Sequence, residues 1–173
     1  MSLNLSAETL KYNLTNPART YMWDIIFPRV VGGGDNNALT IRAQSTAIPG
    51  RSIGTILLPY KATAGVIYPG KNTYDHEWSV TFLEGEDKKI HNAIYTWMNY
   101  AVDDIYGFGA GDLVVKSDIY LRLLSTRSGS EHAVFRMVGA FPTNIAKAEL
   151  DNASEDVVRY SVTFGYDRWV DAT

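Results

Sequence analysis

The chain offers several residues that could do chemistry, but none stands in a catalytic or metal-binding pattern. It has no cysteine, which excludes disulfides, thiolate metal sites and thiol nucleophiles. The three histidines, His76, His91 and His132, fall on separate predicted elements, and none has a second ligand at metal-binding spacing. Asp75 and Glu77 flank His76, but neighbouring side chains of a strand point to opposite faces. The sequence therefore predicts no metal site and no cofactor.

Patterns for nucleotide binding and nucleophilic catalysis are also missing. The run 32–37 (Gly-Gly-Gly-Asp-Asn-Asn) lacks the Lys-Ser/Thr pair and the helix start of a phosphate loop, so we interpret it as a turn. The glycine-rich run 107–111 follows a predicted helix instead of a strand, which is the wrong context for a dinucleotide site. No Gly-x-Ser-x-Gly elbow occurs. We therefore expect that the protein is not an enzyme.

Length and composition favour one globular domain, which we take to span residues 1–173. The chain is 46% hydrophobic and 20% charged, as in globular proteins. Its net charge of −3 lacks the basic excess of proteins that grip nucleic acid, so DNA that meets it should pass over it. No apolar run approaches the ~18 residues needed to cross a bilayer, and no signal-peptide pattern is visible. We expect no membrane insertion.

Alternation of apolar and polar residues predicts a mainly β fold. One segment, residues 87–101, instead has its apolar residues at helical spacing, and a shorter helix is predicted to begin at Ser6. Successive strands with one good helix predict a rolled antiparallel β-sheet or barrel-like sandwich with that helix packed on the outside. The apolar faces of the predicted strands are Tyr21, Trp23, Ile25 and Phe27; Trp78, Val80 and Phe82; Ile119, Leu121 and Leu123; Ala133, Phe135, Met137 and Phe141; and Val158, Tyr160, Val162, Phe164 and Tyr166.

Two segments fit neither pattern. The glycine-rich segment 103–112 is expected to be a loop. Residues 49–71 mix prolines and glycines with large apolar residues, and a loop of about 20 residues inside a domain is uncommon and usually functional. Because exposed apolar residues need a covering surface, we expect this loop to contact another subunit. The residues assigned to this contact are Gly50, Arg51, Ile53, Ile56, Leu57, Leu58, Tyr60, Val66, Ile67 and Tyr68.

Several segments follow one another in a distinctive order along nearly the whole chain. They are 16–19 (Asn-Pro-Ala-Arg), 43–50 ending in Ile-Pro-Gly, 69–82, the helix with its late Trp97, 138–145 with its Pro-x-x-Ile turn, and 161–169. In this order they resemble the tail tube proteins of contractile-tailed bacteriophages, which are related more distantly to the tube proteins of contractile injection systems. The resemblance implies that six copies form a ring whose inner wall is a continuous β-barrel, and that rings stack into a tube. It also implies that the loop from Gly50 to Tyr74 reaches a neighbouring subunit or ring.

The same resemblance implies a set of partners and a lumen. The partners would be further copies of the chain, a sheath, baseplate and tail-terminator proteins, and DNA that passes non-specifically through a virion tail assembled in the host cytoplasm. A lumen should be polar and poor in Lys and Arg, so that phosphates are not held. The candidate lining residues form two polar faces: Glu77, Ser79 and Thr81 on one predicted strand, and Ser161, Thr163 and Asp167 on another. An ordinary solvent-facing surface explains each face equally well, and Arg159 on the second face counts slightly against a lumen there.

Other roles stay open at the level of the sequence. A tube initiator, baseplate hub or capping protein would share the fold, although the short chain favours the repeating subunit. The tube of an injection system or bacteriocin is a further alternative. A small-ligand-binding β-barrel would be a stable monomer with a cavity, and it would leave the resemblance unexplained. A β-barrel enzyme would need a convergent catalytic set, which the sequence does not show.

Overall fold

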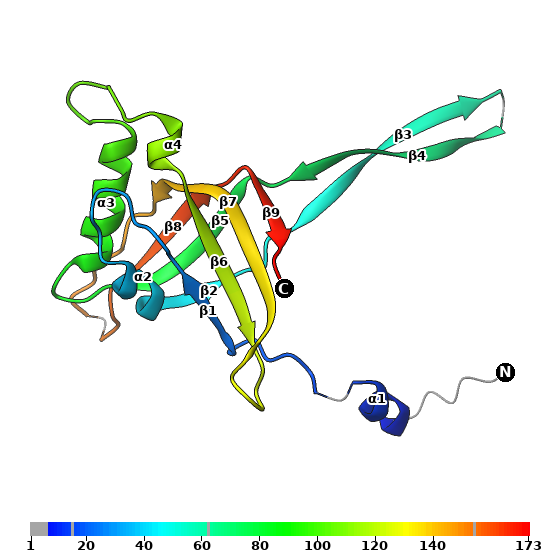
Figure 1. The fold of residues 1–173 in the computed structure, drawn as a ribbon, viewed down its shortest axis with the longest axis horizontal. Helices are drawn as coiled ribbons and strands as arrows, with labels where there is room; N and C mark the ends of the chain where they lie inside the picture. Colours follow the sequence, from blue (N-terminus) through cyan, green and yellow to red (C-terminus); the bar gives the residue numbers. More distant parts are fainter. Residues whose placement is uncertain (1–6, 15, 62, 154) are drawn as a thin grey trace.

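The computed structural model describes residues 7–14, 16–61, 63–153 and 155–173. Its body is a seven-stranded antiparallel sheet, from which a separate two-stranded hairpin projects (Figure 1). This confirms the mainly β fold that the alternation predicts. The strands of the sheet are β1 (Trp23–Ile26), β2 (Ala43–Thr46), β5 (Glu77–Leu83), β6 (Ser117–Leu124), β7 (Glu131–Ile145), β8 (Arg159–Gly165) and β9 (Arg168–Asp171).

Helices in the described part of the chain are α1 (Ala7–Asn13), α2 (Asn36–Arg42), α3 (Lys89–Ala101) and α4 (Asp112–Val115). The predicted main helix is confirmed as α3, and its buried residues include Ile90, Ile94 and Trp97 of the predicted stripe. The predicted N-terminal helix is present as α1, while Ser6, its expected first residue, lies outside the described residues.

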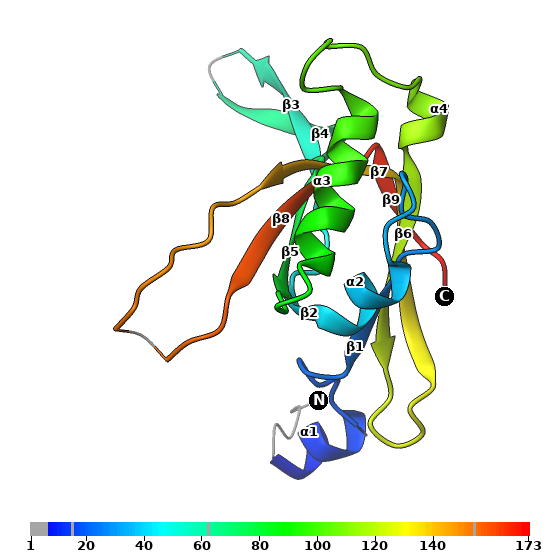
Figure 2. The same cartoon turned by 90° about the vertical axis from the view of Figure 1, so that its left-hand side faces the viewer.

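The sheet is rolled but it is not a closed barrel. Its strand order is β1-β6-β7-β8-β5-β2, with β9 added to β7. The long strand β7 pairs with β6 through its first part and with β8 through its last part. Figure 2 shows the result: β6 and β9 lie on one side, β5 and β8 on the other, and α3 covers the space between them. The edge strands β1 and β2 do not pair with each other in the described chain.

The bend in β7 is made by a bulge at Gly139. This residue has a φ of +66°, and the register between β6 and β7 shifts beside it. An extra residue in one strand reverses which side chains face inward. Met137 is therefore buried before the bulge, as predicted, whereas Ala140 and Pro142 are buried after it. The predicted inward position of Phe141 was wrong for this reason, and its side chain is only partly buried.

The core lies between the two halves of the sheet and α3. The predicted inward residues of β5 are buried, as are Val162 and Phe164 of β8, whereas Tyr160 of β8 is only half-buried. Trp97 of α3 packs on Phe164 with ring centroids 6.2 Å apart. The Trp97 Nε1 donates a 2.8 Å hydrogen bond to the Val115 carbonyl oxygen, so the buried indole leaves no donor without a partner. Tyr21 was predicted on the first inward face, but β1 begins only at Trp23 and the Tyr21 side chain is exposed.

The glycine run 32–34 leads into a helix, which the sequence interpretation did not expect. Asp35 is the N-cap of α2, and its side chain accepts a 3.1 Å hydrogen bond from the backbone N–H of Ala38. A carboxylate at this position satisfies one of the free N–H groups of the first helical turn. The prediction of a turn without a helix start was therefore wrong, because the cap residue Asp35 was read as part of the turn.

A charged cluster ties α2 to the start of α3. Arg42 donates two hydrogen bonds to the Asp87 carboxylate, at 2.7 and 2.6 Å. These bonds from Arg42 lower the pKa of Asp87 to about 2. Glu84, which also faces Arg42, accepts hydrogen bonds from the backbone N–H groups of Ile90 and His91, so it caps α3. The helix is thereby held on the open side of the rolled sheet.

Candidate assembly surfaces

The predicted contact loop is an ordered β-hairpin, made of β3 (Arg51–Tyr60) and β4 (Thr63–Tyr74). The prediction of a loop was wrong because two register shifts break the alternation, and because prolines argue against a strand. In a ribbon of only two strands each strand has one unpaired side, where a proline without an N–H is tolerated. Nearly all residues assigned to this contact lie on the hairpin, and Gly50 directly precedes it.

The hairpin is apolar on both faces. Cross-strand partners share a face, and neighbouring pairs alternate between faces. The exposed fractions of the paired apolar side chains in 56–58 and 66–68 range from 49% to 65%. Monomers rarely expose so continuous an apolar surface, and an isolated ribbon is only marginally stable in water, so both faces need a cover. The pairs are Leu57–Ile67 on one face, and Ile56–Tyr68 and Leu58–Val66 on the other.

Hydrogen bonds fix the base of the hairpin to the body. At its start, the Trp169 Nε1 donates to the Gly50 carbonyl oxygen at 2.9 Å. After its end, the Nδ1 of His76 lies 3.0 Å from the Tyr166 carbonyl oxygen, so this nitrogen carries the proton. His76 also has a φ of +57°, an uncommon conformation for a residue other than glycine. These contacts set the direction in which the hairpin leaves the sheet.

Most of the candidate lining residues meet on one face of β5 and β8. Ser79 is the cross-strand partner of Thr163, and Thr81 is the partner of Ser161. The hydroxyl oxygens of Ser79 and Thr163 lie 3.2 Å apart. Glu77 stands at the end of the same face, opposite Gly165. The other face of these two strands is the buried core, so this hydroxyl face is the outer surface of the rolled sheet.

Asp167 does not join the hydroxyl face. It lies beyond the end of β8, in the turn to β9, and accepts a 2.8 Å hydrogen bond from Lys116 Nζ. Two residues that the sequence analysis missed do extend the face. Ser45 of β2 is the partner of Thr81, and Asn144 of β7 is the partner of Thr163. Only the order of the strands reveals them.

The charge of Arg159, at the start of β8, is neutralised locally. Its guanidinium donates to both carboxylate oxygens of Asp156 at 2.9 Å and to the Gln44 side-chain oxygen at 2.9 Å. The pair lowers the pKa of Asp156, chiefly through the Arg159 hydrogen bond. The cation that counted against a lumen on this face is therefore bound to a carboxylate of the same chain.

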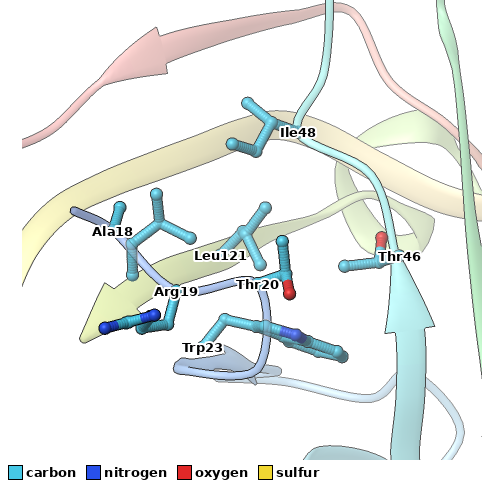
Figure 3. A pocket seen from close by; sticks show the side chains of 8 residues that line it. Ala18, Arg19, Thr20, Trp23, Thr46, Ile48 and Leu121 are labelled. Carbon is cyan, nitrogen blue, oxygen red and sulfur yellow. The ribbon is translucent and has the colours of Figure 1, made fainter. Parts of the chain in front are cut away.

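A small pocket marks the seam where the sheet fails to close. Figure 3 shows Thr46 and Ile48, from β2 and its continuation, facing Trp23 of β1 and Leu121 of β6. Its volume of about 240 Å³ is below the roughly 300–1,000 Å³ of typical ligand pockets. The lining is mostly apolar and consists of Ala18, Arg19, Thr20, Trp23, Thr46, Ile48, Leu121 and Leu123.

Two other kinds of site are not found in the part of the chain that the structure describes. No group of three or more His, Asp or Glu side chains is arranged to hold a metal ion. The described helices are all too short or too polar to cross a membrane.

Several solved structures share the fold of this chain. The fold is similar to a chain of the sheath–tube complex of the PVC extracellular contractile injection system in its extended state, with a TM-score of 0.67, 20% identity, and 97% of this chain and 99% of that chain covered. It is also similar to the tube-terminating cap of the anti-feeding prophage (AFP), with a TM-score of 0.68, 19% identity, and 91% and 92% covered. A chain of the AFP baseplate gives a TM-score of 0.66 at 10% identity, with 90% and 95% covered.

At these identities the solved structures show a shared fold alone. No curated protein sequence gave a significant match. The sequence profile of one family, described as phage tail tube protein, matches residues 14–172. Because this match spans nearly the whole chain, the chain belongs to the phage tail tube protein family.

Proposed function

We propose that the chain is the repeating subunit of a tail tube, in which copies close into rings and rings stack around a hollow lumen. The projecting hairpin carries this proposal, because its two apolar faces need partners that the subunit itself does not provide. By resemblance to the tube proteins, a ring holds six copies. Its further partners are a sheath, a baseplate and a tail terminator, and its role is structural and not enzymatic.

The open edges of the sheet support ring closure. Strands β2, β5, β8 and the last part of β7 form an antiparallel series, so the outer strands of this series run in opposite directions. A β2 strand from a second copy, laid against the last part of β7, would continue the antiparallel pattern. Unpaired edges invite such pairing. A closed ring uses every one of these edges and leaves none for uncontrolled aggregation.

The hydroxyl face of β5 and β8 is placed toward the lumen in this arrangement. If the antiparallel series forms the inner wall, the core and α3 lie outside it, and the lumen is lined by Ser45, Ser79, Thr81, Ser161, Thr163 and Asn144. Hydroxyl and amide groups interact with phosphates without the strong attraction of Lys or Arg. Such a lining suits DNA that must slide during ejection from a virion.

A capping or initiating ring is the second candidate, because the AFP cap and baseplate chains share the fold as closely as the PVC sheath–tube chain does. Negative-stain electron microscopy and sedimentation of the purified protein separate the two roles. Hollow tubes of variable length support the repeating subunit, whereas rings that never stack support a cap. A monomer at all concentrations contradicts both.

The lumen assignment is tested by cysteine labelling, which is clean because the chain has no cysteine. Ser79→Cys lies on the hydroxyl face, and Asn92→Cys on the exposed side of α3 is the matched control. A maleimide attached to a bulky polymer should modify both variants as dissociated subunits, but only Asn92→Cys in assembled tubes. Equal labelling of Ser79→Cys in tubes contradicts the assignment.

A further inference from the structure

The hairpin carries a positive charge and no acidic residue of its own. Its charged residues, Arg51, Lys61 and Lys71, give it a net charge of +3, with no acidic residue between positions 51 and 74. All three are exposed, and none forms an ion pair with another described residue. A basic, apolar ribbon of this kind matches a partner surface that is acidic and partly apolar.

Segment 146–158, between β7 and β8, has the opposite charge. It contains four carboxylates and one lysine, a net charge of −3. Among the carboxylates, Glu149, Asp151 and Glu155 are exposed and make no ion pair with a described residue.

The same segment also exposes apolar side chains. Leu150 is 81% exposed and Val157 is 52% exposed. Together with the carboxylates they give the segment the two properties that the hairpin requires of a partner: negative charge and uncovered apolar surface.

The two elements leave opposite ends of the β5–β8 ladder. The hairpin ends just before Glu77, which pairs with Gly165, whereas the acidic segment leads into Arg159, which pairs with Leu83. At about 3.3 Å per residue, the two ends of this ladder are roughly 20 Å apart. Both views place the hairpin toward the top and the described part of the acidic segment lower down, and in Figure 2 both project to the left. The hairpin therefore points away from the acidic segment of its own chain.

We propose that the hairpin of one copy docks on segment 146–158 of a copy in the next ring. When subunits stack along the strand direction, the end that carries the hairpin in one copy meets the end that carries the acidic segment in the next copy. This is a heterologous, head-to-tail contact, which can repeat from ring to ring. The basic side chains then face the carboxylates, and the apolar residues of the hairpin face Leu150 and Val157. This inference rests on the proposed tube function and adds the pair of surfaces that holds the rings together.

Charge reversal tests the pairing. The hairpin variant is Arg51→Glu, Lys61→Glu and Lys71→Glu, and the segment variant is Glu149→Lys, Asp151→Lys and Glu155→Lys. Each variant alone sets like charges against each other at every ring contact, so the subunit concentration needed for tubes should rise by about tenfold or more. Rings should persist, because ring closure uses the strand edges. A one-to-one mixture of rings of the two variants should stack, because every contact in alternating order is complementary.

Mixing the hairpin variant with wild type is the matched control and should not improve tube formation beyond that of the wild type alone. Tubes of the wild type should also shorten as NaCl is raised to 1 M, where the screening length falls to about 3 Å. The pairing is overturned if the single variants form tubes like the wild type, or if two folded, ring-forming variants fail to stack when mixed. Those results leave the proposed function intact, whereas a wild type without rings or tubes would remove both.

Discussion

The apolar faces of the hairpin give the most quantitative prediction. Leu57 and Ile67 are cross-strand partners with exposed fractions of 62% and 65%. Complete burial of such a side chain stabilises by about 1.5–3 kcal/mol, so covering the exposed part contributes roughly 1–2 kcal/mol at each position. The double variant Leu57→Thr/Ile67→Thr should therefore weaken assembly by about 2–4 kcal/mol per subunit, which raises the critical concentration for tubes roughly thirty- to a thousandfold.

Leu57→Val/Ile67→Val is the matched control. Valine has the shape and the strand preference of threonine but remains apolar, and the loss of one methylene at each partly exposed site should cost about 1 kcal/mol, or roughly fivefold in critical concentration. Sedimentation across a concentration series measures both variants, and thermal melts of the dissociated subunits should differ from wild type by less than about 0.5 kcal/mol because the side chains are exposed. Equal critical concentrations for the two variants would falsify the idea that this face is covered in the assembly.

Three further predictions concern the fold that carries the surfaces. The hydrogen bonds from Arg42 lower the folded-state pKa of Asp87 to about 2, so this pair stabilises the fold above the ordinary carboxylate pKa and loses its effect as the pH falls toward 2; thermal melts from pH 5 to pH 2 should decline less steeply for Asp87→Asn than for wild type. Trp97→Ala should lower the free energy of unfolding by about 3–5 kcal/mol in urea titrations, because Trp97 is fully buried, and a loss below about 1 kcal/mol would contradict its place in the core. Gly139→Ala should lower the Tm, because a Cβ at this φ of +66° would lie 2.4 Å from the Asp167 Oδ2, and an unchanged Tm would show that the bulge does not need glycine.

The strands of the core and α3 could be predicted because their patterns are local. The inward residues of β5 and β8 alternate without interruption, and the apolar stripe of α3 repeats at helical spacing. Phe141 was misplaced because one inserted residue at Gly139 reverses the alternation, and the sequence gives no sign of the insertion other than the glycine itself.

The hairpin could not be predicted as a hairpin because it has no core of its own. Its large apolar side chains are exposed on both faces in the described part of the chain, so the alternation that marks a half-buried strand is absent. Its exposed apolar surface was nevertheless predictable, because large apolar residues such as Leu57 and Ile67 lacked an inward face to join. The contact of this surface with another subunit stays a prediction.

The hydroxyl face was predicted in part. Ser79, Thr81, Ser161 and Thr163 follow from alternation within each strand, but Ser45 and Asn144 depend on which strands are neighbours. Such long-range pairing is not written in any local pattern. The charge of segment 146–158 was likewise visible in the sequence, whereas its position opposite the hairpin required the β5–β8 register.

A cryo-EM reconstruction of the assembled wild-type protein tests the account most directly. We predict stacked rings around an open lumen, with the hydroxyl face of β5 and β8 on the inner wall and both faces of the hairpin covered by other copies. An assembly without a lumen, or one in which the hairpin stays exposed to solvent, would contradict the account.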